Sequence, residues 1–288
     1  MLEFWQNLPL YINPIIFSIG NLSFRWYSLG YVLALITIYI LLKYQLKNNR
    51  NIFIPKNLSL SKLENILLAG FLGALLGGRI GYIVFYDWTN LIYYPWQIFW
   101  PFSDGSFVGF YGMSFHGGLL GALLAGWLIC KKYSLDFWKI VNFIIPAFPL
   151  GYFWGRIGNF MNGELYGRFT DSNLGMHFKS DNATEIAILL GSVPQNPLRH
   201  PSQLYEAFGE GILLFFILAY FTRKKFWSQN LLWLFLIFYG IIRFAIEFFR
   251  QPDPQLGFIF LGWMTMGQIL SLGMFSIGLI ILWVKKIH

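Results

Sequence analysis

Seven long apolar stretches, separated by short polar connections, are the feature that most limits how this chain can fold. They lie at 20–42, 63–86, 110–130, 140–160, 204–222, 230–250 and 261–284. Each has about the 20 residues that an α-helix needs to cross the hydrocarbon core of a bilayer. Since only 12% of the residues are charged, the chain lacks the polar surface of a soluble domain. The sequence therefore predicts an all-α, polytopic membrane protein with seven transmembrane helices, forming a single integral-membrane domain over 1–288.

Two prolines, Pro146 and Pro149, interrupt the fourth stretch. Buried membrane helices tolerate proline where neighbouring helices satisfy the freed carbonyl groups. We therefore keep 140–160 as a span, although it is the least regular of the seven. An odd number of spans places the two termini on opposite sides of the membrane.

Basic residues predict which side is which. Of the 21 lysines and arginines, 13 lie in the loops on one side of the predicted membrane. The opposite loops hold only Arg168, Lys179 and Arg199, all within the 161–203 connection. Cytoplasmic loops are the basic ones in membrane proteins. The N-terminus is thus predicted to be periplasmic and the C-terminus cytoplasmic, with 161–203 forming a small periplasmic lobe.

The other five basic residues are all arginines, and they lie within or at the ends of the spans: Arg25, Arg79, Arg156, Arg243 and Arg250. In the predicted topology all five, and His116, fall in the external third of the membrane. Such a buried charge costs about 2.5–3.5 kcal/mol on insertion scales. Arg25 and Arg250 could instead reach the outer headgroups. Because guanidinium groups bind phosphate bidentately, we predict that the inner three bind an anion, such as a lipid headgroup.

The segment 155–167, at the outer end of the fourth span, is the densest in polar groups. It carries Arg156, Asn159 and Glu164, which fall on one face if the helix continues. A cation, amides and a carboxylate at a membrane boundary need many hydrogen bonds. The group could be a polar clasp between helices, but it holds more polar side chains than a clasp requires. We therefore predict a binding site.

A second polar stripe runs along the sixth span. Tyr239, Arg243, Glu247 and Arg250 are spaced by four, four and three residues, which places them on one helix face. Arg243 and Glu247 can neutralise each other at this spacing. The stripe still carries positive charge that nothing in the same helix pairs, so we assign it to the same anion site.

His116, within Met-Ser-Phe-His-Gly-Gly at 113–118, is the only one of four histidines in a predicted span. A histidine in this setting is often only a packing residue. A neutral imidazole near pH 7 is also a suitable proton acceptor. No spacing of His, Cys and carboxylates matches a metal site, so neither a metal nor another cofactor is expected.

The glycine-rich segment 70–81 of the second span ends in Gly-Gly-Arg-Ile-Gly. Small residues at such spacing let membrane helices pack closely, and we assign most of this signal to packing. The packing face would bring Arg79 into the helix bundle, where it joins the candidate lipid-binding residues.

Six segments, in chain order, resemble the motifs of the bacterial prolipoprotein diacylglyceryl transferase family. They are Arg-Trp-Tyr at 25–27, Gly-Gly-Arg-Ile-Gly-Tyr at 77–82, His-Gly-Gly at 116–118, the 155–167 segment, His-Pro-Ser-Gln-Leu-Tyr-Glu at 200–206, and 239–247 followed by Arg-Gln-Pro-Asp at 250–253. The resemblance implies a multi-pass enzyme of the bacterial inner membrane whose active site opens to the periplasmic leaflet. Such an enzyme moves the diacylglyceryl group of phosphatidylglycerol to the lipobox cysteine of a preprolipoprotein, which yields a thioether and glycerol 1-phosphate.

The resemblance also implies roles for single residues. Arg156 would bind the phosphatidylglycerol headgroup, Arg243 would be a second indispensable cation, and His116 matches a histidine proposed as the base. Tyr27 and Glu164 are expected to take part in catalysis with these three. The remaining candidates for lipid binding are Asn159, Gly167, Glu247, Tyr239 and Arg79.

Two other classes of function fit a basic outer layer: a transporter or flippase for an anion, and a non-catalytic receptor for lipoprotein precursors. Transporters usually place charges near the midplane and show internal repeats. Here the inner halves of the spans are plain hydrocarbon, and the sequence shows no repeat. Phosphatidylglycerol and preprolipoproteins are therefore the expected partners. Nucleic acid is not, because a net charge of +8 reports topology first in a membrane protein.

Overall fold

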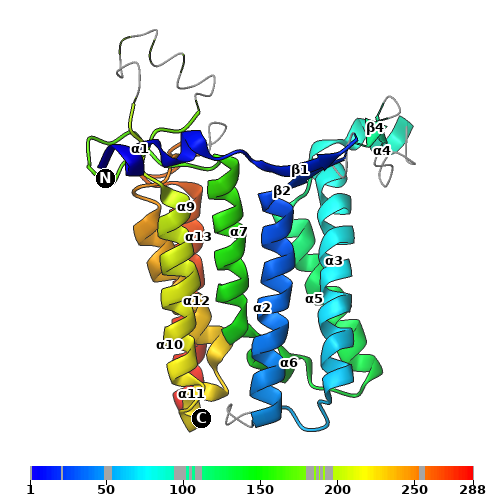
Figure 1. Cartoon of the computed structure of the whole chain (residues 1–288). Coiled ribbons are helices and arrows are strands. Elements are labelled where there is room, and N and C mark those ends of the chain that lie inside the picture. Colours follow the sequence, from blue (N-terminus) through cyan, green and yellow to red (C-terminus); the bar gives the residue numbers. More distant parts are fainter. Residues whose placement is uncertain are drawn as a thin grey trace. The chain divides into compact units, whose positions relative to one another are not determined.

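The computed structural model describes residues 2–20, 22–48, 54–93, 102–103, 106–107, 112–179, 185, 188, 191, 197–252 and 257–287. Helices dominate these residues, as Figure 1 shows. The chain divides into two compact units. The first unit comprises Met1–Phe17, Ser23–Leu42 and Ile144–His288, and the second comprises Ser18–Leu22 and Lys43–Phe143. The helical class is confirmed, while the single integral-membrane domain stays a prediction.

Five helical segments are long and apolar enough to cross a membrane: Trp26–Asn48, Leu60–Phe85, Phe137–Asn162, Ser202–Phe221 and Met266–Ile287. They coincide with the first, second, fourth, fifth and seventh predicted spans. The helices at the other two predicted spans are shorter or less apolar. Helix α12 (Leu231–Ile246) has 16 residues, and α5 (Phe115–Lys132) has 18 residues, of which the last two are lysines. Seven spans therefore stay a prediction.

The helix of the fourth predicted span is interrupted at its prolines. Helix α6 (Phe137–Ile144) is followed by the 3₁₀ turn η2 (Ile145–Ala147) and then by α7 (Phe148–Asn162). Pro149 lies in the first turn of α7, where a missing backbone N–H costs nothing because it would have no partner within the helix. Gly163 ends α7 in a left-handed conformation, with φ of 68°.

Helix α1 (Leu2–Tyr11) and the paired strands β1 (Ile15–Ile19) and β2 (Leu22–Arg25) precede α2 (Trp26–Asn48). Most of these residues belong to the first unit, whereas Ser18–Leu22 and the end of α2 from Lys43 on belong to the second. Helix α2 packs closely on α7. A Cβ on Gly30 would stand 2.9 Å from the Trp154 carbonyl oxygen, and one on Gly158 would stand 3.2 Å from Tyr27. Glycine at both positions lets the two backbones approach.

Much of the rest of the first unit is built on three long helical elements. The run of α9 (Ser202–Glu206), the π-helical η3 (Ala207–Leu213) and α10 (Leu214–Phe221) is continuous. After the short α11 (Lys225–Ser228), α12 packs against α13 (Met266–Ile287). Their shared hydrophobic core consists of Leu214, Leu218, Leu231, Leu234, Ile237 and Leu282.

The described part of the predicted 161–203 lobe folds back on the helix ends. Backbone bridges join Gly167 to Arg250, and join Arg199 to both Phe169 and Met176. The lobe is also tied to α1, because the His177 N–H donates to the Gln6 carbonyl oxygen at 2.7 Å. Most of 180–196 lies outside the described residues, and a small periplasmic lobe over 161–203 stays a prediction.

In the second unit, α3 (Leu60–Tyr86) lies along α5. It is followed by α4 (Trp88–Tyr93) and the short antiparallel pair β3 (Phe102–Ser103) and β4 (Ser106–Phe107). Glycines face each other between the two long helices, and a Cβ on Gly121 would collide with the Gly73 carbonyl oxygen. The sequence prediction of a glycine packing face within 70–81 is thus confirmed.

Candidate functional site: a buried arginine–glutamate cluster

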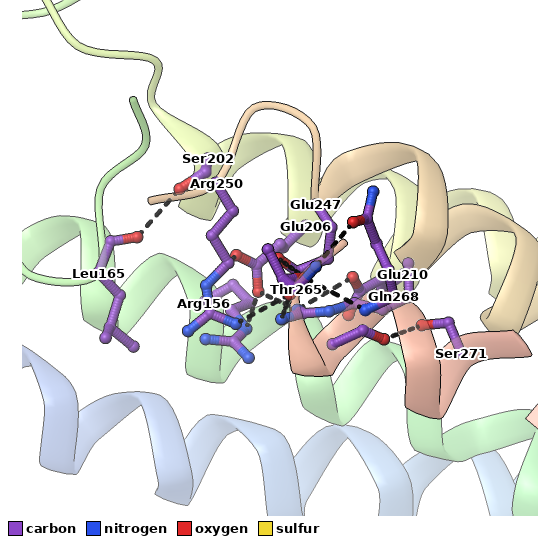
Figure 2. Close-up of polar contacts among 12 residues, drawn as sticks. Arg156, Leu165, Ser202, Glu206, Glu210, Glu247, Arg250, Thr265, Gln268 and Ser271 are labelled. Carbon is purple, nitrogen blue, oxygen red and sulfur yellow. Dashed lines mark hydrogen bonds and ion pairs between the residues drawn. The ribbon is translucent and has the colours of Figure 1, made fainter. Parts of the chain in front are cut away.

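Three arginines and three glutamates of the first unit gather into one group, which we call the ionic cluster: Arg156, Arg243, Arg250, Glu206, Glu210 and Glu247 (Figure 2). They come from α7, from α9 and η3, and from the C-terminal part of α12 with the residues just after it. Glu206 and Glu210 are only 0% and 1% exposed. Charged groups lie this deep almost only when paired, and here three positive and three negative charges balance.

Glu206 is the centre of the ionic cluster. Arg156 Nε and Arg243 Nη1 lie 2.9 and 3.0 Å from the same carboxylate oxygen, Glu206 Oε2. The Tyr152 hydroxyl donates to that oxygen at 3.1 Å. The other oxygen, Oε1, lies 4.0 Å from Arg250 Nε. The two arginines expected to act together therefore meet, and the group between them is a carboxylate of the chain itself.

Arg243 is surrounded by three carboxylates. Besides Glu206, its Nη1 lies 3.4 Å from Glu210 Oε1, and its Nη2 lies 2.6 Å from Glu247 Oε1. The predicted pairing of Arg243 with Glu247 is thus confirmed. The positive charge that the sixth span could not pair within its own helix finds its partners in Glu206 and Glu210, on a different helical run.

Arg156 begins a chain of hydrogen bonds toward the helix end. Its Nη1 donates to Asn159 Oδ1 at 3.2 Å, and Asn159 Nδ2 donates to Glu164 Oε1 at 2.9 Å. The predicted grouping of these three residues is confirmed, but not on a continuous helix. Helix α7 ends at Asn162, and the left-handed Gly163 turns the chain so that Glu164 faces back toward Asn159.

The lobe and the start of α9 hold this turn in place. Gln203 Nε2 donates to the Glu164 carbonyl oxygen at 2.6 Å. Ser202 Oγ donates to the Leu165 carbonyl oxygen at 3.0 Å, as Figure 2 shows. The Gly167 N–H donates to the His200 carbonyl oxygen at 2.8 Å, and a Cβ on Gly167 would collide with the chain at Phe249. The candidate Gly167 is therefore a close-approach position.

His200 lies beside this turn, just before α9. Its Nδ1 is 3.2 Å from the Tyr205 hydroxyl oxygen. Burial lowers the pKa of the His200 imidazole, so the ring adds no charge to the site at neutral pH.

Glu247 is fixed from the side of α13. The Thr265 hydroxyl donates to Glu247 Oε2 at 3.3 Å, and Arg250 Nη1 lies 3.7 Å from Oε1. Gly267, in the first turn of α13, leaves room for this carboxylate, because a Cβ there would collide with it. Arg250, which could have reached the headgroups, thus belongs to the ionic cluster instead.

The other candidates lie in two places. Tyr27 packs on Gly158, and its hydroxyl oxygen is 2.7 Å from that of Tyr31. The ring of Tyr239 meets the ring of Tyr152 edge to face at 6.5 Å, which places Tyr239 beside the ionic cluster. His116 and Arg79 belong to the second unit.

In the second unit, the His116 side chain is exposed at the start of α5, and its ring lies 5.7 Å from that of Phe115. Arg79 Nη1 donates to the Gly112 carbonyl oxygen at 3.4 Å. The roles of both residues stay predictions.

Sequence reasoning did not place Glu210 or Tyr152 in the site, and it included Glu206 only as the last residue of the 200–206 motif. A signal for the two glutamates was present. They are four residues apart within an apolar stretch, and a carboxylate inside a span needs a cationic partner. The unpaired charge of the sixth span was the other half of that signal. Tyr152 is one aromatic residue among many and carries no such mark.

The same helices also border an apolar groove of about 490 Å³. Its lining comes from α9, η3 and α12 and consists of Leu204, Tyr205, Phe208, Gly209, Leu213, Ile241, Ile242, Ala245 and Ile246. Several lining residues directly precede a charged residue of the ionic cluster in sequence, such as Gly209 and Ile242. These elements therefore present hydrocarbon on one face and charge on another, as suits the binding of an amphipathic molecule.

Comparisons with known proteins point to one family. A sequence model described as prolipoprotein diacylglyceryl transferase matches residues 14–284. A protein of Chlorobaculum tepidum is 46% identical over 287 residues, which covers 98% of this chain and 93% of that protein. A protein of Legionella pneumophila strain Lens is 41% identical, covering 96% of this chain and 98% of its own length. One of Campylobacter lari is 42% identical, covering 96% and 95%. All three are named phosphatidylglycerol–prolipoprotein diacylglyceryl transferase.

Proposed function

We propose a reaction for this chain on the premise that it belongs to the prolipoprotein diacylglyceryl transferase family. It is a transferase that moves the diacylglyceryl group of phosphatidylglycerol to a prolipoprotein. In the proposed chemistry, the acceptor is the thiol of a lipobox cysteine. Its sulfur bonds to the glyceryl carbon while the bond from that carbon to the phosphate oxygen breaks. The products are a thioether and glycerol 1-phosphate, and the thiol proton balances the charge that the phosphate gains.

The observation that carries this proposal is the meeting of Arg156 and Arg243 at one carboxylate oxygen, at 2.9 and 3.0 Å. The shared carboxylate holds two guanidinium groups in fixed positions close together within an otherwise apolar bundle. The departing phosphate gains negative charge in the transition state, and fixed cations at low local dielectric stabilise such charge well. We infer that the phosphate of phosphatidylglycerol binds here, and that both arginines are needed.

Roles for the surrounding residues follow from their contacts. Asn159 and Glu164 continue the hydrogen bonds of Arg156, so they are proposed to orient its guanidinium group toward the lipid. Glu247 is proposed to hold the Arg243 guanidinium group in place through their ion pair. The further residues proposed for lipid binding or catalysis are Tyr27, Gly167, Tyr239 and Arg79.

The attacking sulfur must lose its proton, because the thiolate is the nucleophile. We propose His116 as the acceptor, since its side chain is exposed and makes no hydrogen bond with the described residues. The alternative is that the positive field of the arginines lowers the thiol pKa enough without a dedicated base.

We further propose seven transmembrane helices in the bacterial inner membrane, with a periplasmic N-terminus and a cytoplasmic C-terminus. The balance of basic loops supports this orientation, and it puts the ionic cluster in the periplasmic leaflet. Helices α5 and α12 would then complete the set of spans. A reporter fused after Ser228, before α12, should lie in the cytoplasm. A reporter that is active only in the periplasm should therefore show no activity at this position, and activity there would contradict the orientation.

The reaction itself is tested with purified protein in detergent micelles. Phosphatidylglycerol labelled in its acyl chains is supplied together with a lipobox peptide, and peptide mass and free glycerol phosphate are both measured. We expect a gain of one diacylglyceryl group on the peptide and an equal amount of glycerol phosphate. A matched peptide with serine in place of the cysteine should gain nothing.

The same assay separates the alternative functions. A transporter or flippase would move lipid in vesicles without producing glycerol phosphate. A receptor would retain the peptide with its mass unchanged. Either result with active, folded protein would contradict the proposed reaction.

A further inference from the structure

The two central arginines of the ionic cluster have different surroundings. Both terminal nitrogens of Arg243 face carboxylates, those of Glu206, Glu210 and Glu247, and its side chain is 10% exposed. Arg156 meets only the Glu206 carboxylate and is 17% exposed. Its other partners are the neutral groups of Tyr152 and Asn159. The chain therefore already compensates the charge of Arg243, whereas it compensates that of Arg156 only in part.

This difference decides where a phosphate can bind. A phosphate that reached Arg243 would have to displace Glu206, Glu210 or Glu247 from it. The displaced carboxylate would stay buried without its cation, which is among the costliest changes in a protein interior. A phosphate at Arg156 displaces none of the three. Among the described residues, Arg156 Nη2 has no hydrogen-bond partner, so an N–H edge is open there.

Glu210 is the member of the cluster that phosphate binding alone does not explain. It lies on the π-helical η3, it is 1% exposed, and one of its oxygens is 3.4 Å from Arg243 Nη1. Its other oxygen, Oε2, is buried and has no hydrogen-bond partner among the described residues. A buried anion that is only half satisfied costs stability, so an apolar side chain would serve a purely structural role better.

We propose that Glu206 and Glu210 are positioning residues of the transfer reaction, that Arg243 acts through them, and that Arg156 is the cation that touches the lipid phosphate. This inference rests on the proposed function. Glu206 sets the place of Arg156 through the ion pair with its Nε. Arg243 and Glu210 keep Glu206 in place by completing the charge balance. Arg243 is then indispensable although the lipid does not contact it.

The proposal is tested by removing charges in pairs. The variants are Arg243→Gln, Glu210→Gln and the double variant that carries both. A second double variant, Arg156→Gln with Glu210→Gln, has the same net charge as the first double variant. For each, kcat and KM for phosphatidylglycerol are measured in mixed micelles with the lipobox peptide, and the unfolding temperature is measured in the same detergent.

We expect Arg243→Gln to lower kcat/KM by about 1,000-fold, because it leaves buried carboxylates without their cation. The double variant that also carries Glu210→Gln should have a kcat/KM at least about tenfold above that of Arg243→Gln. Removing both partners of a buried pair costs less than removing one. The matched double variant that lacks Arg156 should be no more active than Arg156→Gln alone. Its KM for phosphatidylglycerol should be raised. Glu210→Asp, which keeps the charge, should be more active than Glu210→Gln.

The proposal is wrong if the Arg243→Gln, Glu210→Gln double variant is no more active than Arg243→Gln alone, because Arg243 would then contact the phosphate itself. It is also wrong if Glu210→Gln lowers only the unfolding temperature and leaves kcat per folded molecule unchanged. These outcomes differ from a failure of the proposed function, in which the unaltered protein would yield no lipidated peptide at all.

Discussion

Two helix contacts of this protein, one in each unit, bring helices together by opposite means. In the first unit, α7, α9, η3 and α12 meet at the ionic cluster, where three arginines and three glutamates are buried in contact with one another. In the second unit, α3 and α5 meet at what we call the glycine seam, formed by Gly73, Gly77, Gly81, Gly117 and Gly121. One contact depends on charge and direction, and the other depends on the absence of side chains.

This difference teaches which changes each region can absorb. Burying charges costs free energy unless each donor faces its acceptor. The cluster therefore loses function when a single donor or acceptor atom is displaced. A seam of backbones in contact has no direction to lose, but it has no spare volume either. A substitution in the ionic cluster that keeps the charge but changes the geometry should therefore lower activity. A substitution in the glycine seam that adds volume should instead lower stability.

The largest effect is expected from Arg156→Lys. Lysine keeps the charge but cannot bond Glu206, Tyr152 and Asn159 at once and still present a planar edge to a phosphate. We expect kcat/KM to fall by about 1,000-fold, the upper range for loss of one fixed transition-state donor. Labelled phosphatidylglycerol and a lipobox peptide measure this loss.

The matched control is Arg25→Lys, since Arg25 is exposed on β2 and lies outside the ionic cluster. It should change kcat/KM by less than about twofold, as is usual for surface positions. If Arg156→Lys were as active as this control, charge alone would suffice, and the contrast between a directional cluster and a seam would be lost.

The second effect concerns the one candidate catalytic side chain of the second unit. If His116 accepts the thiol proton, His116→Gln should lower kcat by about 100-fold, within the usual range for loss of a general base. His177→Gln, in the lobe, is the control and should be nearly silent. Turnover close to normal in His116→Gln would remove the base from the second unit, and the arginines of the first unit would then have to lower the thiol pKa alone.

The glycine seam is tested by Gly121→Ala. The added methyl group would collide with the Gly73 carbonyl oxygen, so the helices must separate. We expect a loss of about 2 kcal/mol in the free energy of unfolding, as is typical for overpacking, seen as a lower unfolding temperature in detergent. Gly70→Ala on α3 is the control, because a methyl group added there would meet no atom within 4 Å. Activity per folded molecule should stay unchanged in both.

Sequence reasoning predicted the seam better than the cluster, and the reason is physical. Close packing of glycines is a local pattern, because the spacing within 70–81 already defines a helix face. The apolar stretches behaved likewise, and five of seven reappear as helices long enough to span a membrane. Contacts within one segment were also found, as with Arg156, Asn159 and Glu164, although the turn at Gly163 was not foreseen.

Sequence reasoning predicted only part of the ionic cluster, namely arginines and Glu247. Arg156 and Arg243 were identified because five arginines lie within or at the ends of the predicted spans, and an external anion was the partner considered. Their partners within the chain, Glu206 and Glu210, lie on a helical run that no spacing rule connects to α7 or α12. Pairing between distant segments depends on the fold itself, so a single sequence shows that partners are required without showing which they are.

The smallest effect is expected at Gly267, where a glycine packs against a charged group of the ionic cluster. Gly267 of α13 lies against the Glu247 carboxylate, so a glycine here provides room for a charge instead of for a backbone. Gly267→Ala should push Glu247 away from Arg243 and Thr265 and lower kcat/KM by about tenfold, equivalent to about 1.4 kcal/mol. Gly273→Ala, in the same helix with nothing within 4 Å, controls for helix propensity and should not lose activity.

If Gly267→Ala lowered only the unfolding temperature, as Gly121→Ala is expected to do, the orientation of Glu247 would not matter for the reaction. The ionic cluster would then tolerate displacement of one carboxylate, and the distinction between a region governed by direction and a region governed by volume would hold only for the residues around Glu206.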